Sequence, residues 1–377
     1  MKIGKLADWR KHLATAKTDE ERTLQAALKE AERYGPQDPR LTTSLNNLAE
    51  FYNTQAKYAE AELLLKRALA INEKALGPEH PSVATTLNDL AALYGNQGQY
   101  AHVEPLLKRA LEILEKALGP DHPNVANTLF NLAVLYDSQD KYALAEPLYK
   151  RSLAIREKVL GPDHPDVATT LHLLAILYGD QGKYAQAEPL LKRSLAIREK
   201  VLGPDHPDVA TTLIFLAVDY RLQGQDALAE PLFKRLLAIR EKVLGPEHPD
   251  VATSLNYLAV LYRNQGQDAL AEPLYKRSLA IYEKALGPDH PDVATTLNDL
   301  AALYGNQGQD ALAEPLLKRS LAIREKVLGP DHPDVATTLE NMAVLYRKMD
   351  RNKEARAFEK RAALLSASSP SGILNLH

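Results

Sequence analysis

The chain has 377 residues, and its 46 lysines and arginines nearly balance its 49 aspartates and glutamates, giving a formal net charge of −3. A balance of this kind provides no global electrostatic attraction to nucleic acid or to an anionic membrane. The sequence contains no cysteine, which excludes disulfides, thiolate catalysis and zinc–thiolate sites.

At the N-terminus, the sequence MKIGKLADWRKHLATAK lacks the apolar core of a signal peptide, and no later stretch approaches the length of a transmembrane helix. We therefore expect a cytoplasmic protein without a membrane partner. Within residues 1–34 the pattern predicts two short helices, approximately 3–15 and 19–34, which we interpret as an N-terminal cap.

A twelve-residue phrase, LGPDHPDVATTL, then recurs at a period of 42 residues. It stands at 160–171, 202–213, 286–297 and 328–339, with close variants at 76–87, 118–129 and 244–255 and a degenerate copy at 34–45. A fixed period of this length indicates structural units that stack on their own copies, whereas a catalytic motif is usually needed once. We assign eight such units to residues 35–365.

The unit that begins at Pro81 predicts its own fold. An apolar stripe at helical spacing occupies residues 83–94, Gly98 interrupts it, and a second stripe follows at 103–114 before Gly119 ends the helix. Each unit is therefore a helical hairpin that needs neighbours to bury its stripes. The sequence as a whole predicts an all-α, right-handed superhelical solenoid.

The histidine of the phrase raises the question of a metal site. His206 stands in the turn Gly203-Pro204-Asp205-His206-Pro207, and each of its copies lies one whole repeat away. A metal site needs several ligands that converge on one ion, and a single histidine per repeat edge does not converge. We interpret it as a turn residue bonded to nearby backbone, with Asp208 as a cap or first-turn acid of the next helix.

The repeats resemble tetratricopeptide repeats, whose 34-residue pattern has a small residue at position eight, Tyr at eleven, Gly at fifteen, Ala at twenty and a small residue at twenty-seven. One copy matches at Ala91, Tyr94, Gly98 and Ala110, and another at Ala259, Tyr262, Gly266, Ala271 and Ser278. The chain departs from the pattern at Leu87, Val103 and Leu236. Eight additional residues lengthen the second helix, and this long variant is similar to the repeats of kinesin light chains and nephrocystin-3.

The resemblance implies that the first helices line a groove for extended peptides, through positions two, five, nine, twelve and thirteen. In kinesin light chains, similar asparagines and arginines engage acidic cargo peptides that carry an aromatic anchor. The residues that match this pattern best are Asn256, Arg263, Asn264, Asn298 and Asn306. Asn88 stands at position five of the groove, and Arg221 and Arg347 stand at position twelve. An asparagine amide can bond both the C=O and the N–H of an extended backbone, so we expect these residues to hold a peptide without reading its side chains.

Apolar residues occupy the same positions in three consecutive central repeats. They are Phe130, Val134, His172, Ile176, Ile214 and Val218. An apolar floor bordered by arginine suits a ligand with a hydrophobic anchor and an acidic flank. The alternative interpretation is that these side chains pack between neighbouring helices, or that the ends of two molecules associate there.

Enzyme and RNA-binding functions find little support. Neither GxxxxGK[ST] nor GxSxG occurs, and His172 and Asp180 are too far apart along a helix to form an acid–base couple. RNA recognition would favour a markedly basic groove with aromatic stacking residues. We expect no catalytic residue, metal or cofactor, and a scaffold or adaptor for a protein or peptide partner. The alternative is a self-assembling structural spacer or regulatory repeat module without a peptide ligand, and residues 366–377 are expected to be a disordered tail.

Overall fold

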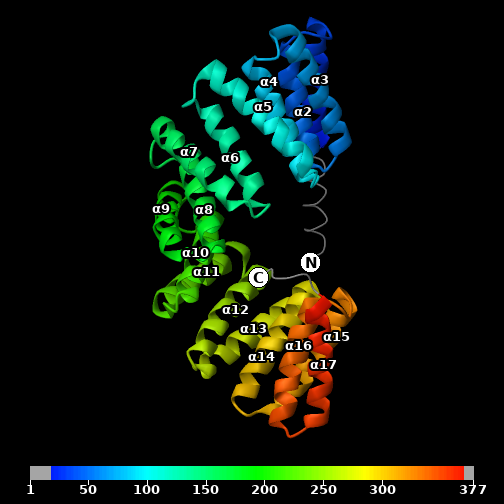
Figure 1. The fold of residues 1–377 in the computed structure, drawn as a ribbon, viewed down its shortest axis with the longest axis vertical. Coiled ribbons are helices and arrows are strands. Elements are labelled where there is room, and N and C mark those ends of the chain that lie inside the picture. The colour runs from blue at the N-terminus through cyan, green and yellow to red at the C-terminus, as the bar shows by residue number, and fades with distance from the viewer. Residues whose placement is uncertain (1–17, 369–377) are drawn as a thin grey trace. The chain divides into compact units, whose positions relative to one another are not determined.

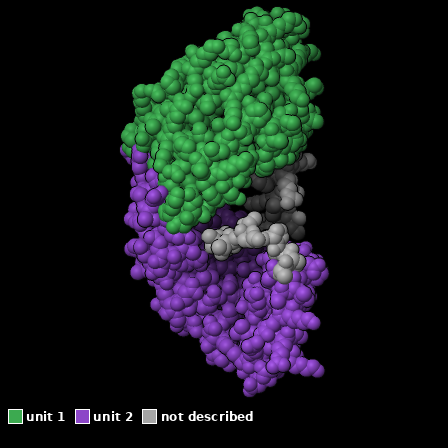
Figure 2. Space-filling view, in the orientation of Figure 1, with its two compact units in different colours: residues 1–183 green, residues 184–377 purple. Residues whose placement is uncertain are grey.

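The computed structural model describes residues 18–368, which contain helices and the turns between them and no strand. The chain divides into two compact units, unit 1 up to Lys183 and unit 2 from Tyr184 (Figure 2). Within each unit, consecutive helices pack against one another and the pairs follow in tandem (Figure 1). The predicted all-α solenoid is confirmed. Over the described range, none of the helices combines the length and the apolar character that a membrane crossing requires.

We call the first helix of each repeat the A helix and the second the B helix. Unit 1 contains the A helices α2 (Arg40–Thr54), α4 (Pro81–Asn96), α6 (Pro123–Asp137) and α8 (Pro165–Asp180), and the B helices α3 (Tyr58–Leu76), α5 (Tyr100–Leu118) and α7 (Tyr142–Leu160). Unit 2 contains the A helices α10 (Pro207–Leu222), α12 (Pro249–Asn264), α14 (Pro291–Asn306) and α16 (Pro333–Lys348). Its B helices are α9 (Tyr184–Leu202), α11 (Asp226–Leu244), α13 (Asp268–Leu286), α15 (Asp310–Leu328) and α17 (Asn352–Ser368).

The two ends of the chain are described in part. Residues 18–31 are helical and continue into the 3₁₀ helix η1 (Glu32–Tyr34), in the place of the second expected capping helix. The first expected capping helix, at 3–15, lies outside the described residues. At the other end α17 continues to Ser368, and residues 369–377 of the expected tail lie outside the described range.

The repeated phrase forms the turn between a B helix and the next A helix. Gly203 ends α9 with φ of 90°, a left-handed value that glycine adopts without strain. His206 follows in extended conformation, and its Nδ1 accepts a hydrogen bond from the backbone N–H of Asp208 at 3.1 Å. Pro207 occupies the first helical position, where a missing N–H is tolerated. The predicted backbone contact of the histidine is confirmed; the histidine is the cap, and Asp208 is the first-turn acid.

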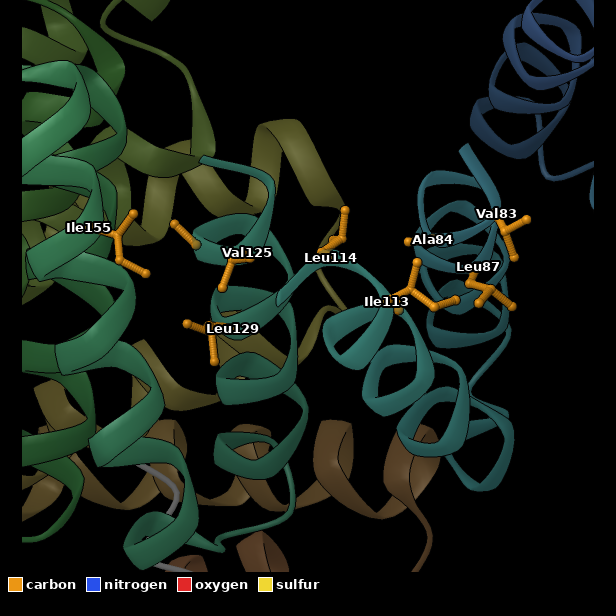
Figure 3. Close-up of a cluster of buried hydrophobic side chains, with 10 residues drawn as sticks. Val83, Ala84, Leu87, Ile113, Leu114, Val125, Leu129 and Ile155 are labelled. Carbon is orange, nitrogen blue, oxygen red and sulfur yellow. The ribbon is translucent and has the colours of Figure 1, made fainter. Parts of the chain in front are cut away.

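The cores lie between repeats, as the apolar stripes require. Figure 3 shows one cluster in unit 1, in which Val83 and Leu87 of α4 face Ile113 of α5, with Leu129 of α6 and Ile155 of α7 beyond. These side chains are at most 4% exposed. Burial of each contributes about 1.5–3 kcal/mol. A hairpin therefore gains its stability from the hairpins on either side.

A polar tie accompanies the apolar contact between repeats. The hydroxyl of Tyr94 in α4 donates to Glu62 of α3 at 2.9 Å, and Lys66 pairs with the same carboxylate. Unit 2 has the same arrangement, for example where Tyr262 donates to Glu230 at 2.9 Å. Because these groups are at the edge of the helix layer, they orient successive hairpins more than they stabilise them.

Candidate functional site

In unit 1 the A helices α2 and α4 enclose a hollow of about 400 Å³, which we call the acidic pocket. It is lined by Thr43, Asn46, Asn47, Ala49, Glu50, Asn53, Leu65, Thr85, Asp89 and Ala92. Two of these side chains are carboxylates, and none is a lysine or arginine. The pocket is therefore polar and carries negative charge.

Asp89 is the half-buried carboxylate of the acidic pocket. It accepts a hydrogen bond from Nδ2 of Asn46 at 2.9 Å. Burial raises the pKa of the Asp89 carboxyl to about 6, and the negative charge of Glu50 adds to the rise. The Oδ1 atom of Asn46 is buried and has no hydrogen-bond partner among the described residues. The pocket thus contains one unpaired acceptor and one ionisable group without a counter-charge.

Unit 2 contains a counterpart of this aspartate with different surroundings. Helices α14 and α4 share the sequence ATTLNDLAALYGN, and Asp299 is the counterpart of Asp89 within it. Oδ1 of Asp299 lies 3.0 Å from Nη1 of Arg263 in α12, whose side chain is 20% exposed. Burial raises the pKa of the Asp299 carboxyl, and the charge of Arg263 opposes that rise. Asn53 of unit 1 stands five repeats before Arg263, just as Asp89 stands five repeats before Asp299.

Two further hollows lie between A helices, one in each unit. The first aliphatic pocket, between α4 and α6, has a volume of about 330 Å³ and is lined by Ala91, Ala92, Gly95, Asn96, Tyr100, Val103, Leu107, Asn131, Val134, Leu135 and Ser138. The second aliphatic pocket, between α14 and α16, has about 100 Å³ and is lined by Ala301, Ala302, Gly305, Asn306, Leu317, Asn341, Val344, Leu345 and Lys348. Each residue of the second pocket stands five repeats after its counterpart in the first.

The two aliphatic pockets differ in their lining at three positions. Tyr100 and Val103 line the first pocket, whereas their counterparts Asp310 and Ala313 do not line the second. Ser138 of the first aliphatic pocket is replaced by Lys348 in the second. The Nζ of Lys348 donates to the carbonyl oxygen of Gly305 at 2.8 Å, so its stem crosses the hollow. An exposed valine, Val134 or Val344, borders each pocket.

Larger side chains fill the corresponding places elsewhere. Tyr149 of α7 and Tyr275 of α13 take the position of the pocket leucines and are fully buried. The hydroxyl of Tyr149 donates to Asp137 at 3.2 Å. Burial raises the pKa of the Asp137 carboxyl to about 6, while the Tyr149 hydroxyl opposes the rise. The hydroxyl of Tyr275 is buried, and no partner for it exists within the described part of the chain.

The residues expected to form the site lie on the A helices of both units. Unit 1 holds Asn88, Phe130, Val134, His172 and Ile176, and unit 2 holds Ile214, Val218, Arg221, Asn256, Arg263, Asn264, Asn298, Asn306 and Arg347. Among these, Val134, Asn264, Asn306 and Arg347 are exposed, His172 and Asn298 are buried, and the others are half-buried. Phe130 packs edge-on against Tyr149, with its ring 5.9 Å from that ring, and beneath the guanidinium of Arg156.

The asparagines at position five bond to the next repeat. Asn88 donates to Thr128 at 3.0 Å, and Asn256 donates to Thr296 at 2.9 Å. Oδ1 of Asn298 accepts from Asn341 at 3.0 Å. These amides therefore hold neighbouring A helices together. Two of the three arginines are also engaged within the chain, since Arg263 pairs with Asp299 and Arg347 lies 2.6 Å from Glu359.

Position six contributes pocket-lining residues that sequence reasoning missed. Asp89 lines the acidic pocket, and Asn131 and Asn341 line the two aliphatic pockets. Over the eight repeats this position reads Asn47, Asp89, Asn131, Leu173, Phe215, Tyr257, Asp299 and Asn341. Along the repeats this position changes from polar to apolar residues and back to polar ones, and that variation could have marked it as a candidate from the sequence.

No metal centre is evident in the part of the chain that the structure describes, since no three His, Asp or Glu side chains are placed to hold an ion. The acidic pocket contributes two carboxylates only. The side chains that line the three pockets offer hydrogen bonding, charge pairing and apolar contact.

Comparison with known proteins places the repeats in a family. The tetratricopeptide repeat profile matches residues 21–74, 40–116, 97–158, 138–200, 177–242, 208–284, 250–326 and 292–363. No curated protein sequence matches the chain.

Solved structures resemble the chain over different lengths. The crystal structure of BtubC (BKLC) from P. vanneervenii shares 25% identity at a TM-score of 0.56, covering 61% of this chain and 93% of that one. The putative kinesin light chain repeats of Podosopora anserina share 31% identity at a TM-score of 0.49, covering 55% of this chain and 97% of that one. The apo form of the quorum sensor NprR from B. thuringiensis shares 13% identity at a TM-score of 0.65, covering 96% of this chain and 98% of that one.

Proposed function

The chain belongs to the tetratricopeptide repeat family, with repeats of the kinesin light chain type, and from this premise we propose that it is a non-enzymatic adaptor. In this proposal its A-helix face holds an extended peptide segment of a partner protein. The observation that carries the proposal is the recurrence of a pocket in both units, with the same residue at eight of the nine positions that line both.

The first aliphatic pocket combines the two features that peptide recognition needs. Leu107, Val134 and the flanking alanines offer an apolar surface for one side chain of a ligand. Burial of an aliphatic or aromatic side chain contributes about 1.5–3 kcal/mol. Asn96 and Asn131 stand at the exposed rim, where their amides can bond the backbone beside the anchored side chain.

The hydrophobic anchor is the principal determinant in this proposal, and an acidic flank is secondary. Arg263 and Arg347 face Asp299 and Glu359, so an acidic ligand has to compete with carboxylates of the chain itself. Arg221 remains as the arginine toward which an acidic residue of the ligand is placed.

The test is a selection from a random peptide library against the immobilised full chain. Val134→Asp places a charge beside the first aliphatic pocket, and Gly95→Leu fills it. A Cβ added at Gly95 would meet no neighbouring atom within 4 Å. Leucine also favours the helix over glycine by about 0.8 kcal/mol. Leu144→Asp is the matched control, because Leu144 is an exposed apolar residue of the B helix α7.

We expect the wild-type chain and Leu144→Asp to enrich peptides with an aliphatic or aromatic anchor, and both pocket variants to lose that enrichment while keeping their helicity. Enrichment that survives both pocket variants would overturn the proposal. If instead the only property that substitutions change is the oligomer size in sedimentation, the self-assembling spacer is the better description.

A further inference from the structure

We propose that the acidic pocket of unit 1 binds the guanidinium group of an arginine side chain supplied by the ligand. The inference rests on the proposed function, because it assigns a charge preference to the same A-helix face. Its basis is a comparison of α4 with α14, two helices of nearly the same sequence, and of the A helix that precedes each of them.

Unit 2 shows what fits beside this aspartate. Asp299 of α14, the counterpart of Asp89, is paired with the guanidinium of Arg263 at 3.0 Å. Unit 1 carries Asp89 at that position but Asn53 in place of the arginine. The result is a hollow of about 400 Å³ that both residues line. The pocket of unit 1 is thus a guanidinium site from which the chain's own arginine is missing.

The remaining lining residues suit the same group. Glu50 adds a second carboxylate, so the pocket prefers a cation to a neutral polar group. Oδ1 of Asn46 is buried without a hydrogen-bond partner in residues 18–368, and an incoming N–H would satisfy it. An arginine carries five N–H donors in one plane and can reach a carboxylate and an amide oxygen together, whereas an ammonium is a compact point charge.

The experiment uses the full chain and two capped tripeptides, acetyl-Ala-Arg-Ala-amide and acetyl-Ala-citrulline-Ala-amide. Citrulline has the length and shape of arginine without its charge. Binding is followed by the amide resonances of α2 and α4 in an NMR titration. We expect the arginine peptide to bind at least tenfold more tightly than the citrulline peptide.

Two variants and one control connect that preference with the pocket. Asn53→Arg installs the arginine that unit 2 already has, and we expect it to reduce the affinity for the arginine peptide at least tenfold while raising Tm. Asp89→Asn removes the carboxylate and should reduce the affinity to the level of citrulline. Thr54→Arg adds the same charge at an exposed neighbouring position and should leave the affinity within twofold of wild type.

Equal binding of the two peptides by the wild-type chain would overturn the inference, as would an unchanged arginine preference in Asn53→Arg. The outcome is distinguishable from failure of the proposed function. If the chain does not discriminate between the arginine and citrulline peptides, but Val134→Asp still abolishes the anchor enrichment, the result counts against the acidic pocket alone. Intact arginine discrimination with anchor enrichment that survives Val134→Asp counts against the aliphatic pocket alone.

Discussion

Asp89 and Asp299 allow one substitution to be tested in two surroundings. Both occupy position six of an A helix, within the shared sequence ATTLNDLAALYGN. Asp299 has the guanidinium of Arg263 at 3.0 Å, whereas Asp89 faces the acidic pocket. We predict that Asp89→Asn stabilises the chain at neutral pH. An asparagine at 89 is uncharged and can still accept the hydrogen bond from Asn46.

The magnitude follows from the titration of Asp89. Its pKa rises from 3.8 to about 6 on folding, chiefly through burial. Because a tenfold change in proton affinity corresponds to about 1.4 kcal/mol, ionised Asp89 lowers the free energy of unfolding by up to about 3 kcal/mol at neutral pH. The folded pKa is the higher one, so the folded chain binds more protons between these two values, and wild-type stability falls as pH rises through them.

The assay is urea unfolding of the wild type, Asp89→Asn and Asp299→Asn at neutral pH and near pH 4. Asp89→Asn should gain roughly 2–3 kcal/mol at neutral pH, and most of that difference should disappear at the lower pH. Asp299→Asn removes the counter-charge of Arg263, so we expect it to be less favourable than Asp89→Asn by about 2 kcal/mol. Equal effects of the two substitutions, or a gain that does not depend on pH, would refute the reasoning.

Three further predictions concern the scaffold. Leu129→Ala removes a fully buried core side chain and should lower the free energy of unfolding by about 2–5 kcal/mol in urea, with Leu144→Ala on the exposed face nearly neutral. His206→Ala removes a helix cap and should cost about 1 kcal/mol, most of it restored by Asn, as measured by thermal unfolding. Lys318, Tyr346 and Arg351 lower the pKa of Glu314 to about 2, so its contribution is complete above its unfolded value of 4.5 and is lost as pH falls toward 2. Acid titrations of Glu314→Gln and wild type should therefore converge at low pH, and parallel curves would contradict this assignment.

The hairpin fold could be predicted from the sequence because its signals are local. The apolar stripe at 83–94, the glycine that ends each B helix and the proline that begins each A helix act within a few residues. The role of His206 was predictable for the same reason, since its partner is the N–H two residues later.

The site was less predictable because it depends on how one repeat packs on the next. Asn88 and Asp89 are adjacent polar residues about 100° apart around one helix, and the repeat pattern marks only Asn88, at position five, as a candidate. Only the structure shows that Asn88 is bonded to Thr128, forty residues later, while Asp89 faces a hollow. Partners at such separations depend on the packing between repeats, which no local pattern encodes.

Two positions together decide which contacts between A helices are hollow. Glycine at position twelve accompanies leucine at position twenty-four, as in Gly95 with Leu107 and Gly305 with Leu317, and these pairs line the aliphatic pockets. A charged residue at position twelve accompanies an aromatic one in three of four repeats, the exception being Arg347 with Glu359. In Asp137 with Tyr149 the hydroxyl reaches the carboxylate and fills the space. A small residue leaves a pocket only if its partner is also short, so the two must change together. Near-identical repeats can in this way carry different binding surfaces on one constant scaffold.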